Sequence, residues 1–144
     1  MQQKDSQDIF EELQAMIDRE MEAVYSKKTI LYFKNPINIG RMEHSDGAAK
    51  MKGECGDTME MYLQIEVEII KEIQYFTDGC GVTIACGSAI TDFIKGKTIH
   101  DALKISPYIL IDELGGLPRD DVHCAILSVA TLHQAIADYL FKTQ

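Results

Sequence analysis

The sequence lacks an excess of positive charge, a long apolar run and an apolar leader. Lysine and arginine number 14 against 23 aspartates and glutamates, so the formal net charge at pH 7 is −9. Such a surface excludes binding to nucleic acid through its phosphates and favours protein partners with basic patches. No run approaches the roughly 20 apolar residues that cross a bilayer. Because the first residues are also polar, we expect a cytoplasmic protein that does not bind membranes.

The cysteines include no Cys-x-x-Cys pair, although there are four of them in the chain. This absence excludes a ribbon-type zinc site and a thioredoxin-like redox motif. In a reducing cytosol, such cysteines are thiols or metal ligands more often than disulfides. The sequence also has no internal repeat and no low-complexity segment.

The remaining composition is that of one globular domain, with 46% hydrophobic and 26% charged residues over 144 positions. Residues 6–24 place apolar side chains on one helical face and carboxylates opposite. Residues 1–24 hold seven acids and two bases, and so carry −5 of the total charge. We predict a helix packed on its own domain, and the alternative is a docking or self-association helix.

The rest of the chain predicts a short helix, three strands and then more helices. Residues 58–66 alternate between apolar and polar side chains, as a half-buried strand does, and few residues separate them from the next strand candidate. This order predicts an α+β fold, with a small three-stranded antiparallel sheet covered by helices on one face. The predicted ranges are helix 25–32, strands 48–52, 58–66 and 69–77, and helices 84–95, 107–114 and 121–141. Thr98-Ile99-His100-Asp101 also resembles a capping box at the start of a helix.

Three cysteines stand where predicted elements begin or end. Cys55 lies between the first two strands, and Cys80, flanked by glycines, lies between the third strand and a helix. A hairpin of the second and third strands places both thiols at one end of the sheet, and Cys124 joins them if the last helix starts there. With Asp57 and His123 nearby in sequence, these thiols predict a metal site at that end.

The ligand types indicate how long such a site would keep its cargo. A permanent iron–sulfur site uses four thiolates, whereas here the fourth ligand would be Asp57 or His123, each less suited to a thiophilic cluster. Such a site suits a cluster that is built and then given away. Each residue alone also has an ordinary explanation: Asp57 as a turn residue, His123 as a helix-start residue, and the cysteines, including Cys86, as small packed side chains.

The motifs, taken in order, resemble the NifU/IscU-type scaffolds for iron–sulfur cluster assembly over residues 25–139. The resemblance covers roughly four-fifths of the chain. The matching residues are Tyr25, Asn35-Pro36-x-Asn38-x-Gly40, Cys55-Gly56-Asp57-x-Met59, Gly79-Cys80, Thr91, Gly96-Lys97-Thr98, Leu117-Pro118, His123-Cys124 and Ala135-Ile136-x-Asp138-Tyr139. Residues 1–24 would then be a helical extension and residues 25–144 the scaffold domain.

The resemblance implies a non-catalytic scaffold that assembles a [2Fe–2S] cluster, or a [4Fe–4S] cluster across a homodimer. It implies sulfur from a cysteine desulfurase, iron, and transfer to apo iron–sulfur proteins. Cys55, Asp57, Cys80 and Cys124 would hold the cluster, with His123 as an alternative ligand, and zinc or ferrous iron can occupy such sites. We take Cys124 as the first candidate for the persulfide acceptor, because a helix start lowers a thiol pKa.

The sequence departs from the family pattern at two places near the site. Arg119-Asp120-Asp121 stands where many members have Pro-Val-Lys, a segment read by a cluster-transfer chaperone, and Cys86 stands where serine is common. Three alternatives remain open: a zinc-binding sulfur-relay protein of the SufU type, a zinc hydrolase with Asp57 or Asp121 as general base, and a structural metal-bound module.

Overall fold

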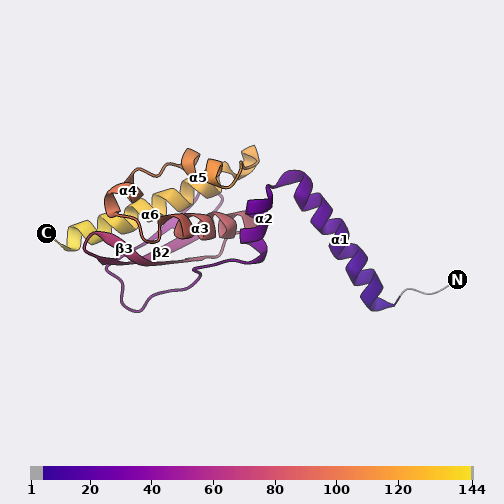
Figure 1. The fold of residues 1–144 in the computed structure, drawn as a ribbon, viewed down its shortest axis with the longest axis horizontal. Coiled ribbons are helices and arrows are strands. Elements are labelled where there is room, and N and C mark those ends of the chain that lie inside the picture. Colours follow the sequence, from indigo (N-terminus) through magenta and orange to yellow (C-terminus); the bar gives the residue numbers. More distant parts are fainter. Residues whose placement is uncertain (1–4, 144) are drawn as a thin grey trace.

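The computed structural model describes residues 5–143 and contains a three-stranded antiparallel sheet (Figure 1). The strands are β1 (Gly47–Lys52), β2 (Thr58–Glu66) and β3 (Ile69–Thr77), in the order β1-β2-β3. Val67 and Glu68 join β2 to β3 with positive φ angles of 50° and 62°, the backbone that a tight two-residue hairpin turn requires. The predicted α+β class and the bounds of β2 and β3 are confirmed.

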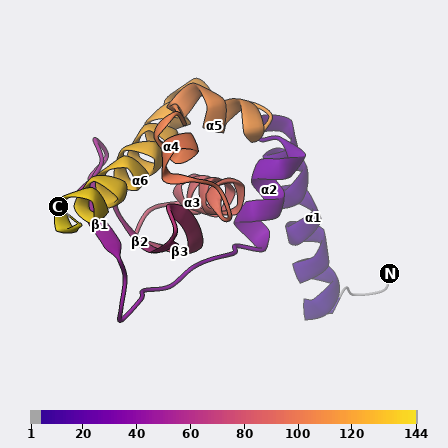
Figure 2. The same cartoon turned by 60° about the vertical axis from the view of Figure 1, so that its left-hand side comes forward.

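The longest core helices lie on one face of the sheet (Figures 1 and 2). α6 packs on β1 and β2, while α3 packs on β3 and against α6. The helices are α1 (Ser6–Val24), α2 (Lys27–Lys34), α3 (Gly81–Ile94), α4 (Ile99–Leu103), α5 (Pro107–Glu113) and α6 (Val122–Lys142), with a 3₁₀ turn at Arg119–Asp121 before α6.

Most helix starts follow the capping residues in the sequence. The hydroxyl oxygens of Ser26, Thr98 and Ser106 each accept a hydrogen bond from a backbone N–H in the first turn of the helix that follows. The helix predicted over 84–95 begins earlier, at Gly81, with the extended backbone of Cys80 as its N-cap. The predicted helix start was too late because the apolar periodicity begins only at Ile84, whereas the backbone is helical from Gly81 onward.

The inner face of the sheet forms the core. Met59, Met61 and Leu63 on β2 are fully buried, as their alternation predicts. On the outer face, Glu60 is not simply solvated, because the Arg41 guanidinium forms two hydrogen bonds of 3.0 Å with its carboxylate. Val67, which follows β2, lies in the turn and is 86% exposed.

One helix of the described chain is long and apolar enough to cross a membrane by length and composition. It comprises the 3₁₀ turn and α6, Arg119–Lys142, with a mean hydropathy of 1.3 over its most apolar window. Half of that window is buried inside the protein, where α6 covers the sheet. The apolar composition of this helix is thus explained by its packing in the core.

α1 projects away from the rest of the molecule (Figure 1). It has no buried residue along its length, and its contacts with the body lie at its C-terminal end, where Lys34 of α2 forms an ion pair of 2.9 Å with Asp18. The prediction that residues 6–24 pack on their own domain is therefore wrong, because an amphipathic pattern shows which face is apolar but not what covers it.

Candidate functional site

The structure brings the predicted site residues together at one end of the sheet. Cys55 and Asp57 lie in the connection between β1 and β2, and Cys80 lies between β3 and α3. Thr58 pairs with Lys52 at this end, and Met59 pairs with Thr77, so the hairpin carries both loops to the same place. His123 and Cys124 arrive on the first turn of α6. This placement confirms the topological argument from the sequence.

A residue that the sequence analysis missed, Thr83, lies among them. Its buried hydroxyl Oγ1 is 3.1 Å from Asp57 Oδ2, 3.4 Å from Cys124 Sγ and 3.6 Å from Cys80 Sγ. The position follows from α3, because the side chain three residues after an N-cap points back toward the helix start. That spacing was the one available signal, but nothing in it specifies what the hydroxyl would meet.

His123 joins the remaining thiol to the group. Its Nε2 lies 3.1 Å from Cys55 Sγ and 3.5 Å from Cys124 Sγ. Thr83 and His123 therefore connect the three cysteines and Asp57 into one network of polar contacts. Cys55 and Cys80 are exposed at its outer side, whereas Cys124 is buried.

The side chains touch in pairs rather than around a common point. Within residues 5–143, no group of three or more histidine, cysteine, aspartate or glutamate side chains is arranged to hold a metal ion. On the Asp57 side the shared partner is Thr83, whose hydroxyl contacts that carboxylate and the thiols of Cys80 and Cys124. The predicted ligands are thus neighbours that contact a side-chain hydroxyl.

Close packing fixes the carboxylate beside the thiols. A Cβ atom added at Gly79 would lie 2.8 Å from Asp57 Oδ2 and 2.8 Å from the Thr83 side chain. Glycine is thus required next to Cys80 for close approach rather than for an unusual φ angle. The Gly79 N–H also donates a hydrogen bond of 3.0 Å to the Thr77 hydroxyl, which fixes the turn that leads into Cys80.

The three thiols with shifted pKa values differ because their surroundings differ. Burial acts to raise the pKa of Cys80, but hydrogen bonds from the backbone and hydroxyl of Thr83 and the backbone of Val82 outweigh it, so that pKa lies below its ordinary value. Burial raises the pKa of Cys124 to about 11, opposed by the Thr83 hydrogen bond. The expectation that a helix start lowers the pKa of Cys124 is therefore wrong.

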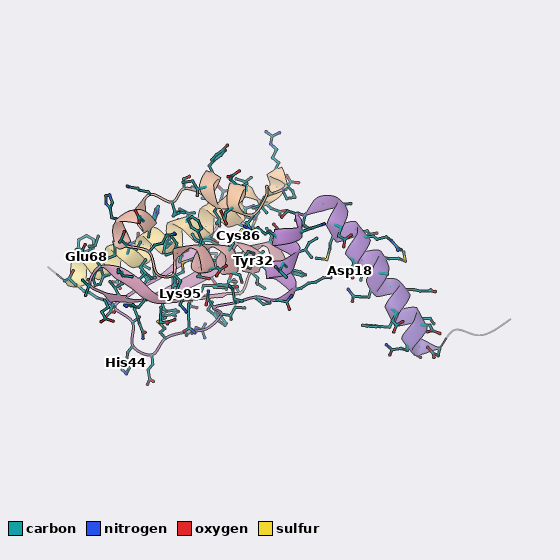
Figure 3. All side chains as sticks on the ribbon, in the orientation of Figure 1. Asp18, Tyr32, His44, Glu68, Cys86 and Lys95 are labelled. Carbon is teal, nitrogen blue, oxygen red and sulfur yellow. The ribbon has the colours of Figure 1, made fainter. Side chains whose placement is uncertain are left out.

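Cys86 lies deeper in the core, on α3 between the other helices (Figure 3). It is completely buried, and burial raises its pKa far above the ordinary thiol value, with the nearby Cys124 and Cys80 adding to the effect. Cys86 is thus close enough to the site to interact with it electrostatically, yet it packs as a small apolar side chain.

An apolar pocket of about 230 Å³ opens beside Cys80. Its walls come from the end of α1, from α2 and from the start of α3, and Asp121 is also part of the lining. Tyr25, which links α1 to α2, has its pKa raised by burial and by the neighbouring Asp121 carboxylate. The principal lining residues are Met21, Tyr25, Phe33, Cys80, Val82 and Asp121.

The fold and the site together define a small α+β protein with a thiol-rich centre at one end of a three-stranded sheet. Residues 24–144 match the family described as the NifU-like N terminal domain, and the chain belongs to this family. A crystal structure of a nitrogen-fixing NifU-like protein (N-terminal) from Brucella abortus has the same fold. That likeness has a TM-score of 0.66 at 18% sequence identity and covers 85% of this chain and 98% of the Brucella chain.

The chain is also similar to curated proteins over most of its length. It is 40% identical over 120 residues to the iron–sulfur cluster assembly scaffold protein IscU 1 of Archaeoglobus fulgidus, which covers 83% of this chain and 78% of that protein. It is 39% identical to the corresponding IscU of Aquifex aeolicus, covering 82% and 77%. The IscU of Escherichia coli strain K12 is 36% identical, covering 83% and 97%.

The thiol pKa values predict an order of chemical reactivity. In metal-free protein near pH 8, we expect iodoacetamide to modify Cys80 at least about tenfold faster than Cys124 or Cys86, because the thiolate is the nucleophile. Peptide mass spectrometry over time measures each rate. Thr83→Val should slow the modification of Cys80, because it removes a hydrogen bond that lowers its pKa, while Thr83→Ser should preserve it. Equal rates of modification at Cys80 and Cys124 would contradict this order of reactivity.

Proposed function

We propose that this protein is a scaffold on which iron–sulfur clusters are assembled and from which they are transferred to apo-proteins. The observation that carries the proposal is the convergence of three thiols, Asp57 and His123 on one network at the end of the sheet. Family membership and relatives that are named iron–sulfur cluster assembly scaffolds support it. The protein's role is to hold and pass on the cluster rather than to catalyse a reaction.

The ligands that we propose for the cluster are Cys55, Asp57, Cys80 and Cys124, with His123 as an alternative ligand. Thiolates suit iron–sulfur clusters, and one oxygen or nitrogen ligand makes the set less firm than four thiolates. The pairwise contacts support a labile site, because the Thr83 hydroxyl bonds Asp57 and Cys124 and would compete with an iron ion for them. We propose a [2Fe–2S] cluster per chain, or a [4Fe–4S] cluster shared by a homodimer.

Sulfur would arrive from a cysteine desulfurase as a persulfide. A thiolate of the scaffold attacks the terminal sulfur, the sulfur–sulfur bond of the donor breaks, and the donor cysteine leaves as a thiolate. We propose Cys124 as the acceptor. Because its pKa is raised, it needs a base, and His123 Nε2, 3.5 Å from its sulfur, can take the proton.

We further propose residues 1–24 as a helical extension and residues 25–144 as the scaffold domain working in the cytoplasm. The match of the family to residues 24–144 supports this division. A zinc-binding sulfur relay would use the same thiols, since zinc also takes cysteine and histidine ligands. The curated relatives described above carry scaffold names, so the scaffold is the function that we put forward.

Anaerobic reconstitution tests the scaffold function. Purified protein is incubated with ferrous iron, cysteine and a desulfurase, and then assayed for iron, acid-labile sulfide and visible absorbance. We expect about two irons and two sulfides per chain, or about four of each per dimer, and transfer of the cluster to an apo-ferredoxin. Tightly held zinc without labile sulfide, even after zinc has been removed and iron supplied, would overturn the proposal.

The persulfide acceptor can be identified by substituting one thiol at a time. Cys124→Ser should lose uptake of sulfur from the desulfurase, because serine cannot form a persulfide, whereas Cys80→Ser should retain it. Mass spectrometry of the metal-free variants after incubation with desulfurase and cysteine detects the added sulfur atom. The reverse pattern would assign the role to Cys80, the thiol with the lowered pKa.

Asp57 should control how readily the cluster leaves. Asp57→Ala removes the hard oxygen ligand, so the set would be completed by His123, whose imidazole suits iron better. We therefore expect slower release, by about tenfold or more. The rate is measured as the loss of scaffold absorbance on transfer to an apo-ferredoxin. Asp78→Ala is a useful control, because Asp78 is a nearby exposed carboxylate outside the Thr83 network. It accepts a hydrogen bond from the Thr58 N–H. Transfer from Asp57→Ala at the wild-type rate would exclude this role.

A further inference from the structure

α1 exposes an apolar face along its whole length. In Figure 3 its side chains extend around the helix, and only its C-terminal end approaches the body. Phe10 is 61% exposed and Leu13 is 53% exposed, although both belong to the apolar face of an amphipathic helix. The other exposed residues of this face are Ile9, Met16, Ile17 and Val24. We call these six residues the α1 face.

A carboxylate stands within the α1 face. Glu20 follows Met16 by four positions and precedes Val24 by four positions, so it lies on the same side of the helix as both. A charge buried without a partner costs several kcal/mol, so a surface that covers the α1 face has to offer a cation to Glu20. This requirement distinguishes the face from one built to pack in an ordinary core.

The charge of α1 limits what can cover it. Residues 6–24 contain six acids and a single base, Arg19. Two copies of this helix packed together would bring like charges alongside each other in either orientation, which destabilises helix pairs. The charge therefore favours a partner whose groove is bordered by lysine or arginine over a second copy of this chain.

The α1 face leads to the pocket at the thiol site. Met21 and Tyr25, at the end of α1, form a wall of the pocket that also contains Cys80 and Val82. A partner lying along α1 would therefore be held next to an exposed site thiol. The pocket can accept an apolar side chain from such a partner, because its lining includes Phe33 and Val82.

We propose that the α1 face is the docking surface for the cysteine desulfurase, which would bind it in an apolar groove with a basic residue opposite Glu20. This inference rests on the proposed scaffold function. A persulfide sulfur moves only when a thiolate attacks it directly, so the donor must dock beside the site in every round of assembly. The recipients of clusters are many different proteins, and one specific helix face suits the single recurrent donor better.

Matched substitutions on the two sides of α1 test this proposal. Leu13→Glu and Ala15→Glu each add one carboxylate, but only Leu13 belongs to the α1 face, since Ala15 lies among Asp8, Glu11 and Glu12. Glu20→Lys and Glu22→Lys each reverse one charge, and Glu22 lies two residues beyond Glu20, on the opposite side of the helix. Circular dichroism confirms that each full-length variant keeps its helix content.

The measurement is the affinity of each metal-free variant for the purified desulfurase of the same organism, by calorimetry. We expect Leu13→Glu and Glu20→Lys to weaken binding by about tenfold or more. The matched controls on the other side of the helix, Ala15→Glu and Glu22→Lys, should weaken it by less than about twofold. Equal effects on the two sides, or wild-type affinity in Leu13→Glu, would overturn the proposal. A wild-type dimer that Leu13→Glu dissociates in sedimentation, with desulfurase binding intact, would also overturn it and assign the face to self-association.

Reconstitution with ferric iron and inorganic sulfide separates this inference from the scaffold function. Sulfide bypasses the desulfurase, so Leu13→Glu should form as much cluster as wild type with sulfide and less with desulfurase and cysteine. If wild-type protein forms no cluster even with sulfide, the scaffold function fails. If it does, and Leu13→Glu is equally active with both sulfur sources, the docking surface alone is wrong.

Discussion

The hydroxyl of Thr83 holds the site together. The site has four acidic groups, and three of them lie around this hydroxyl: the Asp57 carboxylate and the thiols of Cys80 and Cys124. A hydroxyl has only one proton to donate, so it cannot donate to the carboxylate and to a thiolate at the same time. The network is therefore stable enough to keep the side chains adjacent, but each contact in it can be exchanged for a metal bond. This balance is what a site that receives and gives up its cargo requires.

The hairpin that brings the loops of Cys55 and Cys80 together could be derived from the sequence. Strict alternation over residues 58–66 and a short connection to the next strand fixed a hairpin, and a hairpin has only one way to place the loops at Cys55 and Cys80. The sequence placed Cys124 with them only if the last helix starts at that end of the sheet, and the contact between Cys124 and Thr83 shows that it does. Local patterns thus predicted the topology and the neighbourhood of the candidate ligands.

The features that were not predicted depend on three-dimensional surroundings. Burial decides the pKa of Cys124 and outweighs its position at a helix start, and burial is not visible in a short motif. The central place of Thr83 results from how α3 faces the β1–β2 connection. The exposure of α1 could not be predicted either, because a helix that packs on its own domain and one that awaits a partner have the same periodicity.

The projection of α1 from the body has a consequence for encounter kinetics. A helix of 19 residues extends about 28 Å, and unlike a flexible linker it keeps a constant direction. A molecule held on it stays within that radius of the thiols, which corresponds to an effective concentration on the order of millimolar or more. Delivery to the site would then behave as an intramolecular step, whose rate no longer depends on how dilute the donor is in the cell.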